Sequence, residues 1–285
     1  MNDVIRSTCL SKRWPFHVFA AALAFVAPAA LAQPTPIETS SSAAAQPWSA
    51  SSQATVGQPV LIHVIVALCS NEYTYCGSKA KGDPTDLDGN LYWGATFGAR
   101  RLFDSSYSPW TRISANPASG QVLEHLIYQR PSEAFGTVMV SLEAWNGTHT
   151  DEAIDRFFSI ASGGGQVTVQ GRNVPIHAVG YVGLNRLLDG HNLPTASGGQ
   201  AIPSFVIARA SERTFGPALR QAGSFPLVTV HGTVAPEGYT ILAAARAMAD
   251  NYSPRGIRHR MIEEYARYQR TSQRAAAATF PWPHP

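Results

Sequence analysis

Lysine is almost absent from this 285-residue sequence, and acidic and basic residues together make up only 14% of it. The three lysines are Lys12, Lys79 and Lys81, and the remaining basic residues are arginines. The sequence contains no polybasic run and no alternation of basic with aromatic residues. Proteins that bind nucleic acid use such basic patches, so the composition argues against a nucleic-acid partner.

Cysteine is also scarce, with three residues in the chain. Cys69 and Cys76 lie close together, and no Cys-x2-Cys motif or nearby histidine accompanies them. A metal site would need such additional ligands, whereas a pair at this spacing in an exported protein typically forms a local disulfide. We therefore predict a disulfide between Cys69 and Cys76.

Long apolar runs are missing except near the start of the chain. The segment Phe16–Ala30 is apolar and follows the basic residues Arg6, Lys12 and Arg13. A span of the hydrocarbon core takes roughly 20 residues, so this segment is too short for a membrane anchor. It ends in Ala30-Leu31-Ala32, the pattern of small residues that signal peptidase requires. Residues 1–32 are therefore predicted to be a cleavable signal peptide, with no lipid-modified cysteine at the cleavage point.

The chain that remains after cleavage is expected to be nearly neutral and to have no membrane span. Cleavage removes Arg6, Lys12, Arg13 and Asp3, which lowers the formal net charge from +3 to +1. No later segment is long and apolar enough to span a bilayer. The protein is thus expected to be periplasmic or secreted, with no membrane span after cleavage.

Composition divides the remainder into three parts. Residues 33–56 are rich in Pro, Ser, Ala, Thr and Gln and contain few large apolar side chains, which is typical of a disordered linker. Residues 57–274 are long enough to form a single domain with one core. Residues 275–285 contain three prolines and are expected to form a flexible tail.

Apolar runs alternate with helical periodicity along residues 57–274. The predicted strands are 60–69, 122–128, 137–145, 167–169, 176–183, 205–210 and 227–230. The predicted helices are 91–103, 151–160, 235–250 and one that begins at Ser253-Pro254, where serine caps the helix and proline occupies its first turn. Strands that alternate with helices indicate a three-layer α/β sandwich with a mostly parallel sheet. Ligands of such sheets bind beyond the carboxyl ends of the strands.

Polar residues follow several of these strands. A resemblance to a known protein family suggests which of them form a site. The segments that carry it are Asp83-Pro84, Asn90-Leu91-Tyr92-Trp93-Gly94, the Gly-x-Asn at Gly183–Asn185, Phe205–Phe215 and Ala235-Pro236-Glu237-Gly238-Tyr239. In these segments the chain resembles a family of exported bacterial proteins of uncharacterised activity, with the α/β fold of the caspase-like (clan CD) cysteine peptidases. The resemblance covers the chain from about Ile62 to Phe280 and implies a caspase-like topology there. It also implies a catalytic histidine after one strand and a catalytic cysteine after the next.

The sequence departs from that family at both catalytic positions. Leu184 stands where the resemblance places the histidine, and Arg209 stands where it places the cysteine. A cysteine peptidase needs an imidazole to generate its thiolate nucleophile, and neither leucine nor arginine can replace these groups. The two remaining cysteines are assigned to the disulfide. We therefore expect a non-catalytic relative, or pseudo-peptidase, that needs no cofactor.

Binding is then the favoured activity, because an arginine at a strand end can hold a carboxylate. The expected ligand is an unidentified peptide or small anion, and the candidate binding residues are Arg209, Arg186, Asn185, Glu72 and Trp145. The expected carboxylate neighbours of Arg209 are Glu72, Glu143 and Glu237. Trp93 is assigned to core packing, and Asp189-Gly190-His191 to a turn.

Two other functions remain open. Ser211 could act as the nucleophile of a hydrolase with His177 or His231 as its base, although no G-x-S-x-G motif supports this. The protein could instead be a structural envelope component with no ligand site.

One loop contains acidic residues at a spacing that makes them weak candidates for calcium ligands. Asp83, Asp86 and Asp88 alternate there with other residues, and Asn90 follows them. Calcium favours such oxygen ligands, but the glutamate that completes an EF-hand is missing. The competing interpretation is a polar loop in which Asp88 or Asn90 caps the predicted helix 91–103, and we favour it.

Overall fold

The computed structural model describes residues 58–282, so the predicted signal peptide and linker lie outside the described residues. Seven strands form one sheet: β2 (Thr111–Asn116), β3 (Val122–Ser132), β4 (Gly136–Trp145), β1 (Val60–Ala67), β7 (Ala178–Val182), β8 (Ser204–Ile207) and β9 (Pro226–Val228), in that spatial order. The pairs from β4 through β9 are parallel, and β2 and β3 are antiparallel. The prediction of a mostly parallel sheet is confirmed.

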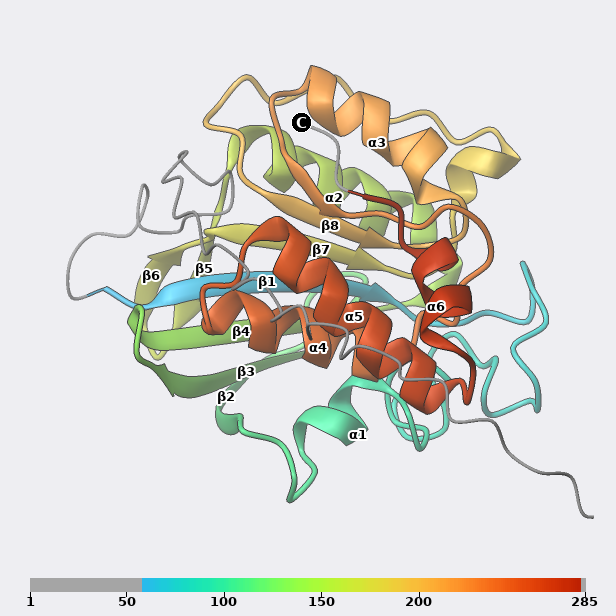
Figure 1. Ribbon diagram of the computed structural model, residues 1–285, viewed down its shortest axis with the longest axis horizontal. Helices are drawn as coiled ribbons and strands as arrows, with labels where there is room; N and C mark the ends of the chain where they lie inside the picture. The colour runs from blue at the N-terminus through green and yellow to red at the C-terminus, as the bar shows by residue number, and fades with distance from the viewer. Residues whose placement is uncertain (1–57, 283–285) are drawn as a thin grey trace, which may run out of the picture. The chain divides into compact units, whose positions relative to one another are not determined.

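Helices cover both faces of this sheet (Figure 1). One face packs against α4 (Gly238–Ala249) and α5 (Pro254–Tyr268), with α1 (Ala99–Phe103) and α6 (Gln273–Thr279) on the same side. The other face packs against α2 (Thr150–Gly163) and α3 (Ser211–Gln221). The result is the predicted three-layer α/β sandwich.

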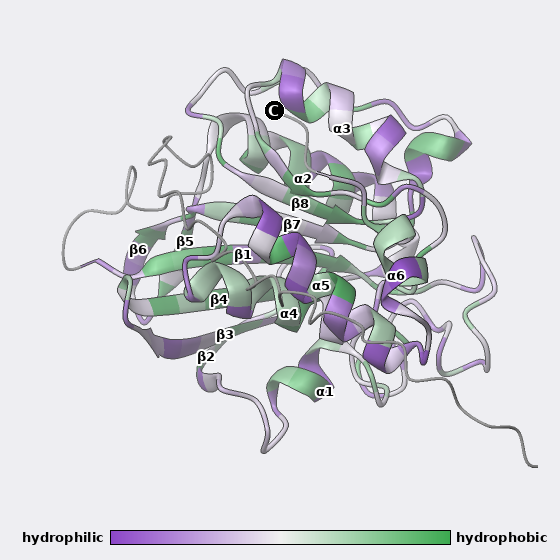
Figure 2. Ribbon diagram, viewed as in Figure 1, coloured by the Kyte–Doolittle hydropathy of each residue, from purple (hydrophilic) through white to green (hydrophobic). Residues whose placement is uncertain are grey.

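The central strand explains why the sheet has two covered faces. All eight residues of β1 are buried, and alternate side chains enter the two apolar cores. Figure 2 shows hydrophobic residues concentrated in the central strands, whereas α5 alternates between hydrophobic and hydrophilic residues along its length. A continuous apolar strand between helical layers is the pattern expected for a parallel sheet.

Several predicted elements are confirmed with small boundary differences. These are the strands β1, β3, β4, β7, β8 and β9 and the helices α2, α4 and α5. The Ser253 hydroxyl accepts a hydrogen bond from the Gly256 N–H at 3.2 Å, with Pro254 in the first turn of α5. Serine therefore caps this helix as predicted.

The predicted helix 91–103 was wrong over most of its length. The segment 91–103 is helical only over α1, because the preceding residues form turns. Gly94 and Gly98 lie so close to neighbouring backbone that an added Cβ would be 2.2 Å from the carbonyl oxygens of Leu87 and Trp93. The predicted strand 167–169 is confirmed as β5 (Gln166–Val169), although it pairs with β6 (Arg172–Pro175) in a separate two-stranded sheet.

The end of the described chain also differs from the expected flexible tail. Residues 273–279 form α6, and the Phe280 side chain is fully buried in the core beneath α5. The Arg258 Nε donates a hydrogen bond to the Phe280 carbonyl oxygen at 2.6 Å. The segment up to Phe280 is thus part of the packed domain.

Candidate ligand-binding site

A pocket of about 380 Å³ opens at the carboxyl ends of β1, β7 and β8. This is the edge of a parallel sheet where ligands bind in α/β folds. The lining residues come from the strand ends, the disulfide loop and the segment before α4: Cys69, Tyr73, Thr74, Tyr75, Leu91, Tyr92, Gly183, Leu184, Asn185, Leu188, Asp189, Arg209, Thr233, Val234 and Pro236.

Leu184 and Arg209 lie together in this pocket. Val182 and Ile207 are paired in register at the ends of β7 and β8, and each of the two pocket residues follows its strand end by two positions. The prediction that these positions share one edge of the sheet is therefore consistent with the geometry. The pair presents an apolar side chain next to a guanidinium, and neither group is a nucleophile.

A tight turn places Arg209 at the pocket. Ala210 adopts a left-handed conformation with φ of 52°, and α3 begins at the next residue. This conformation is unfavourable for alanine. Two long-range hydrogen bonds hold the turn, from Ala210 N–H to Gly232 O at 2.8 Å and from Glu212 N–H to Val230 O at 3.0 Å. Arg209 consequently protrudes from the strand end and is exposed.

The expected carboxylate neighbours of Arg209 lie elsewhere. Glu143 is buried beside His63 and Trp145, and Glu237 accepts a hydrogen bond from Gln269. Glu72 is exposed. Arg209 forms no ion pair with any residue from 58 to 282. Its guanidinium is thus available to an anionic ligand, and the predicted pairing with these glutamates was wrong.

Asn185 lines the pocket and connects the two strand ends. Its side chain is buried, and Nδ2 donates to the Arg209 carbonyl at 2.6 Å and to the Thr214 hydroxyl at 2.8 Å. Its Oδ1 accepts from the Leu187 N–H. Both amide protons are thus used within the protein, and Asn185 holds the backbone of Arg209 at the pocket.

The three other predicted binding residues, Arg186, Glu72 and Trp145, are not among the residues that line the pocket. Arg186 pairs with Asp151 and Asp189 and lies 4.5 Å from the ring centroid of Tyr73, so it supports the pocket wall. Glu72 and Trp145 do not line the pocket. Trp145 packs against the core under α2, and its Nε1 donates to Glu143 at 2.9 Å.

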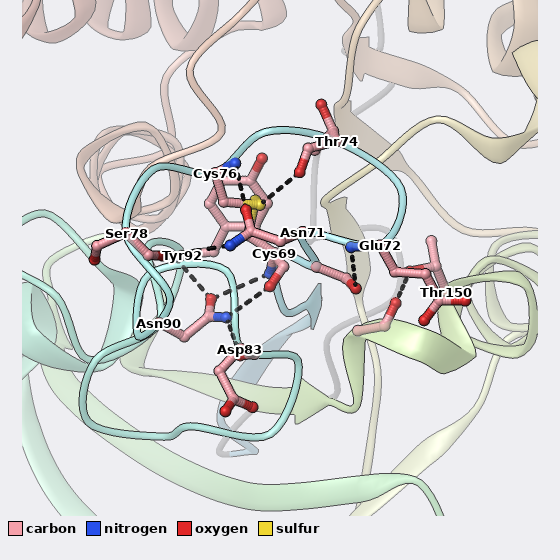
Figure 3. Close-up of a disulfide and its surroundings, with 12 residues drawn as sticks. Cys69, Asn71, Glu72, Thr74, Cys76, Ser78, Asp83, Asn90, Tyr92 and Thr150 are labelled. Carbon is pink, nitrogen blue, oxygen red and sulfur yellow. Dashed lines mark hydrogen bonds between the residues drawn. A yellow bond between two sulfur atoms is a disulfide. The ribbon is translucent and has the colours of Figure 1, made fainter.

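The disulfide loop, which Figure 3 shows with its hydrogen bonds, contributes residues to the pocket lining. Cys69 and Cys76 are bonded with an S–S distance of 2.05 Å, as predicted from their spacing. The loop between them carries Tyr73, Thr74 and Tyr75 into the pocket lining. Tyr75 is 89% exposed, so its ring offers a free surface at the entrance.

Replacing both Cys69 and Cys76 by serine is expected to lower the free energy of unfolding by about 2 kcal/mol. The bond closes a short loop, and the entropy gained by the unfolded chain on its removal is correspondingly modest. Urea denaturation of the double variant and the oxidised protein measures the change. Equal denaturation midpoints would contradict a stabilising bond.

Tyr92 also lines the pocket, and its side chain lies close to the disulfide (Figure 3). Burial raises the pKa of Tyr92 strongly, and the nearby Glu237 raises it further, so the phenol stays protonated. A protonated phenol can donate a hydrogen bond to an anion. Sequence analysis assigned no role to Tyr92 or to the tyrosines of the disulfide loop, because loop residues meet only through tertiary contacts.

The geometry does not bring Ser211 to a histidine. The Ser211 hydroxyl is fully buried, donates to the Val206 carbonyl at 2.9 Å and accepts from the Val230 N–H at 2.9 Å. His231 instead pairs with Glu212 at 2.6 Å on the surface. His177 accepts from the Leu61 N–H, near the opposite ends of the strands. Ser211 therefore fastens α3 to β8 and the segment after β9.

The calcium candidate is likewise organised as a set of turns. Oδ1 of Asp83 accepts from the N–H and hydroxyl of Thr85, and Oδ1 of Asp86 accepts from the N–H groups of Asp88 and Gly89. Asp88 pairs with Arg100. In the described part of the chain, these three carboxylates are not among the groups whose ligand atoms converge. Asp83 and Asp86 are thus engaged in the turns of a polar loop, and neither Asp88 nor Asn90 caps a helix, because α1 begins only at Ala99.

Comparison of the chain with models of known protein families, with curated proteins and with solved structures finds no match. Between residues 58 and 282, no helix combines the length and apolar character that crossing a bilayer requires. The site is therefore interpreted from its own chemistry.

Proposed function

We propose that this protein is an exported, non-catalytic protein of caspase-like topology that binds a peptide or small anionic ligand in the pocket at the ends of β7 and β8. The observation that carries the proposal is the exposed Arg209, which lines the pocket without a carboxylate partner among the described residues. A guanidinium in this position can hold a carboxylate through two parallel hydrogen bonds.

The pocket chemistry favours binding over catalysis. Its lining contains no histidine, and its one cysteine is the oxidised Cys69. Leu184 and Arg209 occupy the two positions where a caspase-like peptidase would carry its base and nucleophile. An acyl-transfer reaction needs both of those groups, so the arrangement supports a pseudo-peptidase.

The surroundings of Arg209 define the kind of ligand. Leu184, Leu188 and Val234 provide apolar surface, and Tyr73, Tyr75 and Tyr92 provide aromatic surface. Within the described part of the chain, Asp189 is the one carboxylate in the lining, and it is paired with Arg186. These features suit a peptide whose terminal carboxylate binds Arg209 while an adjacent apolar side chain contacts the tyrosines and leucines.

Export is part of the proposal, and the disulfide supports it. Such bonds persist in oxidising compartments such as the periplasm or the extracellular space. The Cys69–Cys76 bond also shapes the pocket wall, so ligand binding and the oxidising compartment are linked.

The direct test compares Arg209→Ala with the unmodified protein in binding to short peptides. We expect peptides with an apolar last residue and a free C-terminal carboxylate to bind, and their amidated counterparts to bind at least tenfold more weakly. Arg209→Ala should weaken binding of the free-acid peptides roughly 10- to 100-fold, as loss of a charge-assisted hydrogen bond does. Isothermal titration calorimetry measures both effects.

Arg172→Ala is the matched control, because Arg172 is also exposed and lies on β6 outside the pocket. It should bind the peptides as the unmodified protein does. Equal affinity of Arg209→Ala and the unmodified protein would overturn the site. Absence of binding across the peptide set and small carboxylates would favour a structural envelope role, and peptide cleavage would favour a hydrolase.

A further inference from the structure

A second group of polar side chains lies inside the sheet, away from the pocket. His63 on β1 is paired in register with Ser141 on β4, and Glu143 on β4 is paired with His125 on β3. These four residues project from the sheet face that carries Ile65, because alternate residues of a strand share a face. Three adjacent strands thus bring two imidazoles and a carboxylate together.

The group is buried and has one unsatisfied atom. The His63 side chain is only 1% exposed, and its Nε2 has no hydrogen-bond partner among residues 58–282. This nitrogen is 3.7 Å from Oε2 of Glu143, which is too long for a hydrogen bond. A buried polar nitrogen without a partner is costly, so its presence in an otherwise apolar strand calls for a partner.

The ligand atoms of the three residues converge. One atom each from His63, His125 and Glu143 lies within 4.8 Å of the others. Two imidazoles and one carboxylate are a donor set that zinc takes in proteins, with ligand bonds of about 2.0–2.2 Å. Adjacent ligands of a tetrahedral zinc ion are then about 3.4 Å apart, so the 3.7 Å separation of His63 from Glu143 is close to the required spacing.

We propose that His63, His125 and Glu143 form a buried zinc site that links β1, β3 and β4. His63 binds through Nε2, Glu143 through a carboxylate oxygen and His125 through one ring nitrogen. A water molecule fills the fourth position.

Neighbouring groups orient these ligands. The Ser141 hydroxyl lies 3.0 Å from Nδ1 of His63 and 2.6 Å from Nε2 of His125, and Asn116 lies 3.2 Å from Nδ1 of His125. Trp145 Nε1 donates to Glu143. Zinc-binding histidines typically hydrogen-bond through their other nitrogen in this manner. On binding zinc, His125 exchanges one of its two hydrogen bonds for the metal.

The test measures metal uptake by the complete protein, independently of peptide binding. Protein stripped with a chelator and refolded with Zn²⁺ should retain one zinc per chain after desalting, as measured by elemental analysis. Its thermal midpoint should exceed that of protein refolded without metal. Co²⁺ should produce the visible absorption bands of a four-coordinate site, and Zn²⁺ should abolish them.

Variants separate this site from surface histidines. His63→Gln should weaken zinc binding by more than the ~10- to 100-fold typical of losing an outer-shell partner, and Ser141→Ala should weaken it within that range. Ser141→Ala keeps all three ligands, so it remains informative where His63→Gln fails to fold. His259→Gln is the control, because His259 is an exposed histidine paired with Glu263 on α5.

Two results would overturn the proposal. One is refolded protein that holds no zinc while circular dichroism shows a native fold, which would leave a metal-free hydrogen-bonded network. The other is zinc uptake that His259→Gln abolishes and that His63→Gln and Ser141→Ala leave unchanged.

Discussion

Phe280→Ala is expected to lower the free energy of unfolding by roughly 3–5 kcal/mol, the usual cost of removing a buried phenylalanine ring. The ring is fully buried and meets the Tyr265 ring edge-on, with 5.3 Å between centroids. The neighbouring backbone is held as well, since the His231 N–H donates to the Thr279 carbonyl. Truncating the ring leaves a cavity beneath α5 and loosens α6. Urea denaturation followed by circular dichroism measures the loss.

Tyr107→Ala is the matched control for Phe280→Ala. Tyr107 is 93% exposed, so removing its ring should change the stability by less than about 0.5 kcal/mol. A similarly small effect for Phe280→Ala would indicate that the chain after Arg274 does not pack on the domain, as the composition of the tail suggested.

The sequence predicted elements whose signal is local. A nearly all-apolar run rich in β-branched residues identified β1, and Ser253-Pro254 identified the start of α5. The disulfide followed from the spacing of Cys69 and Cys76. In each case the neighbouring residues in the sequence carry the information, so no tertiary contact was needed.

Elements that depend on distant contacts were missed. β2 is a largely exposed edge strand with a polar sequence, and it forms by pairing with β3. Phe280 stands between threonine and proline in a segment with no periodicity, and only the packing of Tyr265 and α5 reveals its place in the core. α3 begins after a left-handed alanine and contains Pro217, so its local signals are weak.

The residues of the candidate site also divide into those that the sequence could group and those that only tertiary contacts bring together. The resemblance to caspase-like peptidases paired Leu184 with Arg209, and both residues line the pocket. It could not place Tyr92 or Tyr73, since these reach the pocket through loops. The buried zinc candidate had a visible signal that was not used: His63 interrupts an apolar strand, and Ser141 and Glu143 alternate on another. Polar residues at alternate positions of buried strands point to one face, where they need partners.

Asn90 was predicted as a possible helix cap, but the structure gives its side chain a different role. It is completely buried, and its side chain makes four hydrogen bonds to backbone groups (Figure 3). Oδ1 accepts from the N–H groups of Cys69 and Tyr92, each at 3.1 Å. Nδ2 donates to the carbonyls of Cys69 at 2.9 Å and Asp83 at 2.7 Å. One amide thus connects the end of β1 to two separate turns.

Asn90→Ala is therefore expected to lower the free energy of unfolding by roughly 3–5 kcal/mol, because it removes four hydrogen bonds of about 1 kcal/mol each and leaves buried backbone groups unpaired. Asn192→Ala is the control, since Asn192 is exposed and should change stability by less than about 0.5 kcal/mol. Urea denaturation compares the two variants.

Because Cys69 and Tyr92 both line the pocket, folded Asn90→Ala should also bind carboxylate peptides more weakly. Unchanged stability would mean that water replaces the amide, whereas lost stability with unchanged affinity would place the peptide contacts on the Arg209 side of the pocket alone.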